Sequence, residues 1–208
     1  MTSPLELAAN VFTAAAILLA GRNNVHTWWT GIIGCTLFGM LFLQTQLYAD
    51  VVLQAFFVVT GVVGWWRWLH GNGGAPLPIT HAGWRNMAWM TAAGLVATGA
   101  YGAALHFHTN AYAPFIDSAV LVFSVMAQLL MMGRRIESWP VWLLVNTIAV
   151  PLYFSRGLYL TACLYLCFWI NAMVSWIWWR RLAQRELTAM QAAGRATAAD
   201  AVTAGSPT

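Results

Sequence analysis

Long apolar stretches alternate with short polar breaks along most of the chain. The stretches are close to the ~17–25 residues that a helix needs to cross the hydrocarbon core of a bilayer. The pattern therefore predicts seven helices, over Leu5–Gly21, Thr27–Leu43, Ala49–Leu69, Trp84–Leu105, Pro114–Met132, Trp139–Phe154 and Leu158–Trp179.

The polar breaks and the end of the chain look different from these stretches. His70–Ala82 reads HGNGGAPLPITHA, and its glycines and prolines predict a loop. Beyond about Leu187 the chain is rich in alanine and threonine, with little hydrophobic periodicity. We therefore expect a disordered tail there.

The chain contains an internal repeat. A shift of 111 residues, the interval from Tyr48 to Tyr159, places one half of the chain onto the other. The register holds through three apolar stretches in each half without an internal gap. Two copies of a three-helix unit in the same direction are typical of a pseudo-symmetric transporter. The identical pairs include Trp28 with Trp139, Phe57 with Phe168, and Trp68 with Trp179.

The helix over Trp84–Leu105 has no counterpart in this repeat. Three crossings leave the chain on the opposite side of the membrane, so a fourth crossing lets the second unit insert in the same orientation. We therefore expect an all-α integral membrane protein with seven transmembrane helices in a 3+1+3 arrangement of parallel repeats. The expected parts are a first repeat at 1–69, a loop and linker helix at 70–113, a second repeat at 114–186, and a disordered cytoplasmic tail at 187–208.

Composition agrees with a membrane protein and excludes two functions. The chain is 60% hydrophobic and 8% charged, with a mean hydropathy of +0.64, whereas a soluble domain carries about 25% charged residues. It has no lysine, so it cannot form the retinal Schiff base of a seven-helix photoreceptor. The arginines stand singly or in pairs at the ends of the apolar stretches, so the net charge of +4 does not indicate nucleic-acid binding.

The arginines also predict the orientation. With the N-terminus outside, nine of the ten fall on the inner side and Arg156 alone on the outer side. Inner loops carry the excess of positive charge in membrane proteins. We therefore expect the N-terminus outside and the C-terminus in the cytoplasm.

The predicted helix over Trp139–Phe154 carries the clearest candidate site. Trp139, Trp142 and Asn146 stand at positions i, i+3 and i+7, which places them on one helix face. Two indoles with an amide below them could stack on a flat ring and hydrogen-bond its substituent. Two alternatives stay open. Trp139 could be an interfacial belt tryptophan, and Asn146 could instead bond a neighbouring helix.

Matching positions of the two repeats supply further candidates. Gln54 and Tyr165 occupy equivalent positions and are both polar, so we expect them to face each other across the repeat axis. Such a pair of different polar groups could recognise an asymmetric ligand. Phe168 lies on the same helix face as Tyr165. Asn171 is a further polar candidate, with pairing between helices as the alternative.

A carboxylate and an amide on the predicted helix over Pro114–Met132 complete the set. Asp117 is a candidate because carboxylates inside a membrane are costly, although its place near the interface leaves snorkelling to water as the alternative. Gln128 lies about three turns further along, where it could face the same cavity. The three cysteines and five histidines form no metal-binding or disulfide framework, and no catalytic constellation is present. We therefore expect no metal and no cofactor, and we do not expect the chain to be an enzyme.

Three pieces of the sequence carry a resemblance to a known family. They are Leu47-Tyr48-Ala49-Asp50-x-x-Leu53-Gln54, then Gly64-Trp65-x-x-Trp68, and Glu137-x-Trp139-x-x-Trp142-x-x-x-Asn146. Together they resemble the PnuC family of bacterial vitamin transporters. The resemblance covers about Leu5 to Trp179.

The resemblance implies a SWEET-like fold in the bacterial inner membrane. It implies import of nicotinamide riboside by facilitated diffusion, with trapping by a cytoplasmic ribosylnicotinamide kinase that feeds NAD synthesis. In this family the W-x-x-W-x-x-x-N/D pattern is associated with recognition of the riboside, and Trp139, Trp142 and Asn146 match it. The resemblance also implies a homotrimer.

Other functions remain open at this stage. Within the family, relatives move thiamine or riboflavin, and an aromatic site suits thiamine equally well. Outside it, the chain could be a membrane-embedded ligand sensor, although it has no sizeable soluble domain to carry a signal. A membrane enzyme is the third alternative.

Overall fold

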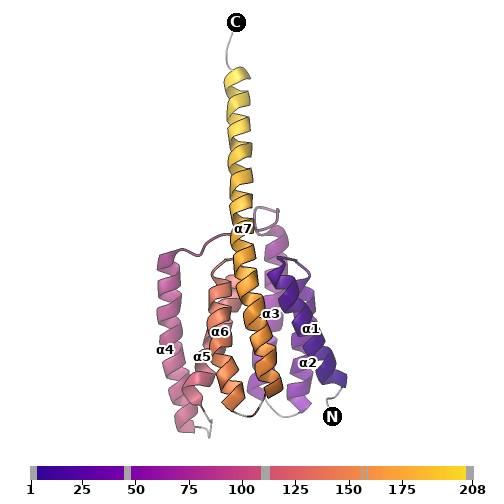
Figure 1. Ribbon diagram of the computed structural model, residues 1–208, viewed down its shortest axis with the longest axis vertical. Helices are drawn as coiled ribbons and strands as arrows, with labels where there is room; N and C mark the ends of the chain where they lie inside the picture. Colours follow the sequence, from indigo (N-terminus) through magenta and orange to yellow (C-terminus); the bar gives the residue numbers. More distant parts are fainter. Residues whose placement is uncertain (1–3, 45–47, 109–112, 156, 158, 205–208) are drawn as a thin grey trace.

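The computed structural model describes residues 4–44, 48–108, 113–155, 157 and 159–204, and its regular elements there are helices (Figure 1). The predicted helices are confirmed, and apart from the end of the last helix their bounds agree to within one turn. Leu47, Arg156 and Leu158, used in the sequence interpretation, lie outside the described residues. The helices are α1 (Pro4–Gly21), α2 (Thr27–Gln44), α3 (Tyr48–His70), α4 (Trp84–His108), α5 (Pro114–Met132), α6 (Ser138–Ser155) and α7 (Tyr159–Ala204).

The last helix is much longer than expected. We expected the chain from Leu187 to be disordered, but α7 continues as one helix to Ala204 and projects beyond the bundle (Figure 1). The physical reason is the alanine content of this segment, because alanine has the highest intrinsic helix propensity. Loss of hydrophobic periodicity here marks the end of packing against other helices and not the end of the helix.

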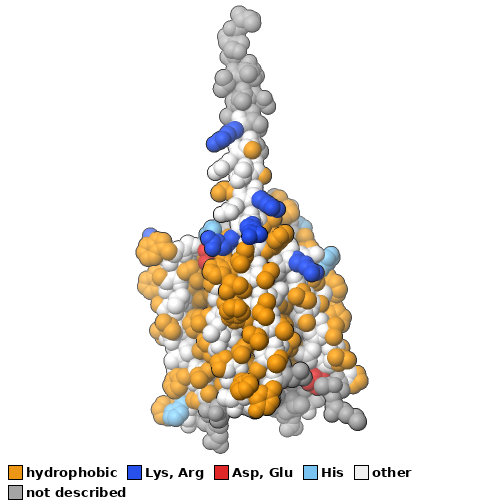
Figure 2. All heavy atoms as spheres, in the orientation of Figure 1, with side chains coloured by type: hydrophobic (Ala, Val, Ile, Leu, Met, Phe, Trp, Pro, Cys, Tyr) orange, Lys and Arg blue, Asp and Glu red, His pale blue; other side chains and the backbone are white. Residues whose placement is uncertain are grey.

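Among the described residues, five helices are long and apolar enough to cross a membrane by length and composition. They are α1, α2, α3, α5 and α7. Polar and small residues lower the hydropathy of the other two, since α6 holds Asn146 and Thr147 and α4 is rich in glycine and alanine. Even so, α4 exposes large apolar side chains, with Trp89 at 75% and Val96 at 73%. Apolar side chains cover much of the bundle surface in Figure 2.

Six of the helices form a closed ring. In the described part of the chain the contacts run from α1 to α2, α3, α5, α6 and α7, and then from α7 back to α1. Within the described helices, α4 packs against α5 alone, at the edge of the bundle (Figure 1). The linker helix therefore stands outside the ring.

The turn after α1 and the turn after α5 have the same backbone. Asn23 and Arg134, which are 111 residues apart, are the non-glycine residues with positive φ in the described chain, at 54° and 50°. Arg22 and Gly133 precede them in equivalent places. Asn23 N donates to Ala20 O at 2.9 Å, and Arg134 N donates to Met131 O at 2.9 Å. A left-handed conformation is costly for arginine, so the fold must require this turn in both places.

Gly64 allows α3 to approach the ring of Trp28. A Cβ atom at this position would lie 2.4–2.8 Å from three atoms of the buried indole. We expect Gly64→Ala to lower the free energy of unfolding by about 1–3 kcal/mol, because the buried ring has no room to shift. Thermal unfolding in detergent would measure this. Gly99→Ala is the matched control, since a Cβ atom there meets nothing within 4 Å, and an unchanged melting temperature for both variants would contradict the packing described.

Candidate functional site

The three candidates on α6 point into the bundle. Trp139 is 2% exposed and Asn146 is 4% exposed, while Trp142 is partly buried and packs against both hydrophobic clusters of the core. The spacing i, i+3, i+7 predicts a shared helix face, and on this face Trp139 and Asn146 are buried and Trp142 is partly buried. The burial of Trp139 excludes its alternative interpretation as a belt tryptophan on the bundle surface.

Asn146 lies on the buried face of α6, with 4% of its surface exposed. Its side chain forms no hydrogen bond among the described residues, yet its amide atoms are not among the fully enclosed side-chain atoms that lack a partner, which are Trp28 Nε1, Thr98 Oγ1 and Trp139 Nε1. The Asn146 amide is therefore still accessible, and its hydrogen bond to a bound molecule or to a neighbouring helix remains a prediction.

Two other candidates connect the halves of the ring. Asn171 Nδ2 on α7 donates to Ile17 O on α1 at 3.2 Å. Gln128 Nε2 on α5 donates to Thr60 Oγ1 on α3 at 3.4 Å. Asn171 thus follows the helix-pairing alternative. In the 111-residue register Ile17 is equivalent to Gln128, and Thr60 is equivalent to Asn171. The contact between α1 and α7 therefore uses the same pair of repeat positions as the contact between α3 and α5.

Gln54 and Tyr165 each pack against a neighbouring helix. The Tyr165 ring lies 4.8 Å from the Tyr153 ring and 5.7 Å from the Phe168 ring, which places it against α6. Gln54 lies beside Gly39 of α2. Among the described residues no hydrogen bond joins the two. Their facing arrangement across the axis remains a prediction.

Asp117 lies far from Gln128 along α5. It occupies the first turn of that helix and is half-buried. Eleven residues separate the two, which is about 16 Å at a rise of 1.5 Å per residue. The structure therefore does not place Asp117 at the level of Gln128, although both are on one helix.

A row of four tryptophans crosses the bundle, and sequence reasoning did not identify it as a site. Ring centroids are separated by 5.3 Å for Trp28–Trp68, 5.7 Å for Trp68–Trp179 and 5.4 Å for Trp179–Trp139. All four side chains are buried. We call these residues the tryptophan row. The signal was present in the sequence, because the row consists of two pairs of repeat equivalents.

Hydrogen bonds of the inner two tryptophans cross between the halves. Trp68 Nε1 on α3 donates to Met131 O on α5 at 3.0 Å. Trp179 Nε1 on α7 donates to Ala20 O on α1 at 3.2 Å. The outer two, Trp28 and Trp139, have buried Nε1 atoms with no partner in the described chain. Hydrogen bonding is therefore symmetric along the tryptophan row, because the two inner indoles donate hydrogen bonds and the two outer indoles do not.

Arg134 holds the loops beside the tryptophan row. Its guanidinium lies 5.2 Å from the Trp68 ring centroid, its Nε donates to Asn23 Oδ1 at 3.0 Å, and its terminal nitrogen donates to Leu77 O. Burial lowers the pKa of Arg134 from its ordinary value, and the charge of Glu186 opposes that change. The bundle end that contains the row is therefore closed by aromatic packing and by hydrogen-bonded loops.

We expect Arg134→Gln to lower the free energy of unfolding by about 2 kcal/mol, because hydrogen bonds from a charged donor are among the stronger ones. Thermal unfolding in detergent would measure the loss. Arg22→Gln removes an exposed arginine at the same end and serves as the control. Equal melting temperatures for the two variants would show that Arg134 does not hold the loops.

These features define the class of the protein. A bundle of membrane-length helices with an apolar exterior and buried polar side chains is a multi-pass integral membrane protein. The sequence model described as nicotinamide mononucleotide transporter matches residues 3–181. The chain belongs to this family of membrane transporters, the PnuC family, and it is not an enzyme.

Curated relatives agree with the family. The nicotinamide riboside transporter PnuC of Escherichia coli (strain K12) is 26% identical over 189 residues, covering 78% of this chain and 79% of the relative. The riboflavin/roseoflavin transporter RibM of Streptomyces davaonensis is also 26% identical, covering 85% and 84%. A solved structure, described as the crystal structure of the vitamin B3 transporter PnuC, matches with a TM-score of 0.67 and 25% identity, covering 87% of this chain and 82% of that one.

Proposed function

We propose that the chain imports nicotinamide riboside across the bacterial inner membrane by facilitated diffusion. The observation that carries this proposal is Asn146, an accessible amide on the buried face of α6 that forms no hydrogen bond among the described residues, one helical turn from Trp142. Relatives named as nicotinamide riboside transporters support the choice of substrate. A cytoplasmic kinase then phosphorylates the riboside, and the added charge prevents its return.

The proposal includes a 3+1+3 arrangement of SWEET-like parallel repeats, with the N-terminus outside and seven crossings. Repeats at 1–69 and 114–186 are joined by the linker segment 70–113, whose helix α4 stands outside the ring. Two observations support a twofold axis between the halves. The turns at Asn23 and Arg134 are equivalent, and the indoles of Trp68 and Trp179 each donate a hydrogen bond to the other half of the chain. The axis would run along the membrane normal.

The pyridinium ring of the riboside stacks on Trp142 in this proposal. Cation–π attraction at a desolvated site contributes about 2 kcal/mol. Asn146 hydrogen-bonds the carboxamide, while Gln54, Gln128 and Tyr165 contact the sugar hydroxyls. Trp139 already packs edge-on against Trp179, so we assign it to the boundary of the site.

Transport then requires opening of the tryptophan row. The row bridges the two repeats, and the cytoplasmic end is its expected location because most arginines lie there. Rocking of one repeat against the other would part Trp68 from Trp179, while the ligand stays near the middle of the membrane. No coupling ion is required, because phosphorylation alone makes uptake unidirectional.

Uptake in cells tests the proposal. A bacterial strain without its own riboside, thiamine and riboflavin transporters would express the chain and receive each labelled vitamin in turn. Uptake of the riboside that accumulates only when the ribosylnicotinamide kinase is present is the expected result. Riboside uptake that accumulates equally without the kinase would contradict metabolic trapping.

Riboflavin is the second candidate substrate. The Streptomyces davaonensis relative is named as a riboflavin/roseoflavin transporter, and its match covers more of this chain than that of the Escherichia coli relative. An isoalloxazine ring also stacks on indoles, but it is neutral and lacks the cation–π contribution. Riboflavin uptake without riboside uptake in the same strain would replace the substrate and keep the fold.

A further inference from the structure

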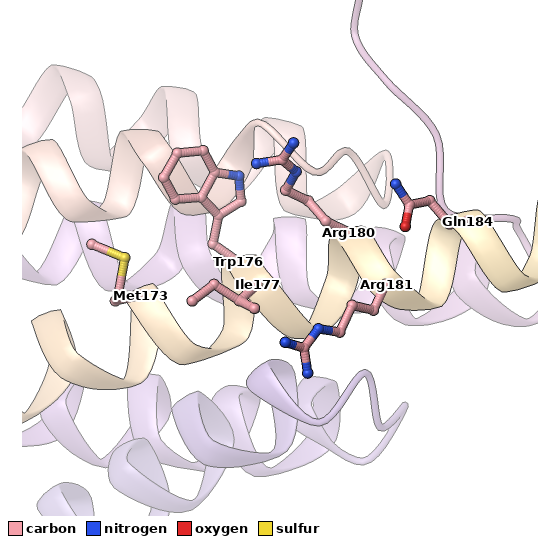
Figure 3. Close-up of a pocket in the computed structure, with 6 residues that line it drawn as sticks. All are labelled: Met173, Trp176, Ile177, Arg180, Arg181 and Gln184. Carbon is pink, nitrogen blue, oxygen red and sulfur yellow. The ribbon is translucent and has the colours of Figure 1, made fainter.

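A shallow groove lies on the outer face of α7, where the helix leaves the bundle (Figure 3). Its lining is divided along the helix axis into an apolar half and a polar half. Met173, Trp176 and Ile177 form the half next to the bundle, and Arg180, Arg181 and Gln184 form the half next to the projecting part. We call this feature the α7 groove.

The bundle covers only part of the α7 groove, since Met173 and Trp176 are partly buried and pack against the hydrophobic core. The six positions lie within about three turns of α7, and those three or four residues apart, such as Ile177 and Arg181, are neighbours on the helix surface. Ile177 is 47% exposed, and Arg180, Arg181 and Gln184 are exposed as well. In Figure 3 the Arg181 side chain extends toward the α1 side of α7, and Trp176 and Arg180 extend to the opposite side. The exposed part of the groove, formed by Ile177, Arg180, Arg181 and Gln184, is therefore open to molecules from the membrane.

The positive charge of the groove is not compensated. Among the described residues, one ion pair lies within 4.0 Å, and it joins His81 to Glu137. Arg180 and Arg181 therefore have no carboxylate partner in this part of the chain. Glu186, the nearest acidic residue along α7, instead accepts a hydrogen bond from Ile79 N at 3.1 Å. Arg185 lines the adjoining hollow, and arginine side chains gather here in Figure 2.

Trp176 lies at the boundary between the apolar half and the polar half of the α7 groove. The Arg180 guanidinium lies 5.9 Å from the Trp176 ring centroid, close to the upper distance limit of about 6 Å for a cation–π contact. Tryptophan favours the interface between the hydrocarbon and the headgroups of a membrane, where its ring is half solvated. The boundary between the apolar and polar halves therefore coincides with the expected level of the headgroups.

We propose that the α7 groove binds an anionic phospholipid. The anionic headgroup lies between Arg180 and Arg181, which flank the groove on its two sides (Figure 3), and one acyl chain lies along Met173, Trp176 and Ile177. Charge complementarity favours an anionic ligand, and the adjoining apolar half favours one that carries a hydrocarbon chain, as a lipid does and a free phosphate does not. This site is separate from the proposed riboside site on α6 and does not depend on it.

The test measures lipid binding to the purified full-length protein by native mass spectrometry in detergent. Phosphatidylglycerol, phosphatidylcholine and glycerol phosphate are titrated separately. We expect phosphatidylglycerol to bind much more tightly than the other two, and Arg180→Gln/Arg181→Gln to weaken its binding about 25-fold, at about fivefold for each arginine near a membrane surface. Arg85→Gln/Arg195→Gln removes the same charge from exposed positions elsewhere and should leave the affinity unchanged.

The apolar half is tested by Ile177→Asn. We expect this variant to lose affinity for phosphatidylglycerol while retaining all four arginines of α7, and the melting temperatures of all variants control for folding. If Arg180→Gln/Arg181→Gln and Arg85→Gln/Arg195→Gln lost equal affinity for phosphatidylglycerol, net charge alone would attract the lipid, and the proposed site would be overturned. Glycerol phosphate binding as tightly as the lipid, or unchanged lipid binding in Ile177→Asn, would also overturn it.

Discussion

Replacing Trp142 by alanine should lower the uptake of labelled nicotinamide riboside about 30-fold at limiting substrate. The proposed stacking of the pyridinium ring on Trp142 contributes about 2 kcal/mol, and each 1.4 kcal/mol corresponds to a factor of ten. Trp142 is partly buried between two hydrophobic clusters, so its removal also opens space next to Asn146. The measurement is initial uptake at a substrate concentration well below KM, normalised to the amount of protein in the membrane.

Two further variants separate stacking from folding. Trp142→Phe retains an aromatic face and should keep most of the uptake. Trp89→Ala removes a tryptophan of α4 that is 75% exposed, and it should have no effect on uptake. Unchanged uptake in Trp142→Ala, with normal expression, would exclude Trp142 from the site.

Replacing Trp179 by alanine should lower the free energy of unfolding by about 3–5 kcal/mol, the usual cost of truncating a buried aromatic side chain. Trp179 is fully buried, contacts Trp68 and Trp139 in the tryptophan row, and bonds Ala20 O. A loss of this size lowers the melting temperature by roughly 10 °C for a chain of this length. Thermal unfolding in detergent gives the value.

The controls for Trp179 come from its neighbour and its repeat equivalent. Trp178 is adjacent in sequence and 48% exposed, so Trp178→Ala should change the melting temperature little. Trp68 is 3% exposed and makes the equivalent hydrogen bond to Met131 O, so Trp68→Ala should resemble Trp179→Ala. If Trp178→Ala and Trp179→Ala were equally mild, the tryptophan row would not hold the two halves together.

Apolar stretch length predicted the helices well because the required length of a membrane helix is a strong constraint. The bounds of α5, Pro114–Met132, follow from a proline at its start and a glycine after its end. The extension of α7 was missed for a different reason. Hydrophobic periodicity reports packing, and the residues after Leu187 form a helix through alanine propensity without packing against the bundle.

The candidate site was only partly predictable. Spacing on one helix identified the buried face of Trp139, Trp142 and Asn146, because residues at i, i+3 and i+7 must share a side. Which helices lie opposite each other depends on tertiary packing, so spacing alone did not indicate that Tyr165 packs against Tyr153 of α6 or that Gln54 lies beside Gly39 of α2. The repeat register already contained the tryptophan row, and only the distances between the rings identified it as one cluster.

Flux into proteoliposomes tests the central claim most directly. Purified protein is reconstituted without ATP or an ion gradient, and entry of labelled nicotinamide riboside is followed against protein-free liposomes. We predict rapid entry that stops when the internal and external concentrations are equal. No entry above the protein-free control would contradict transport of this substrate, and accumulation above the external concentration would contradict facilitated diffusion.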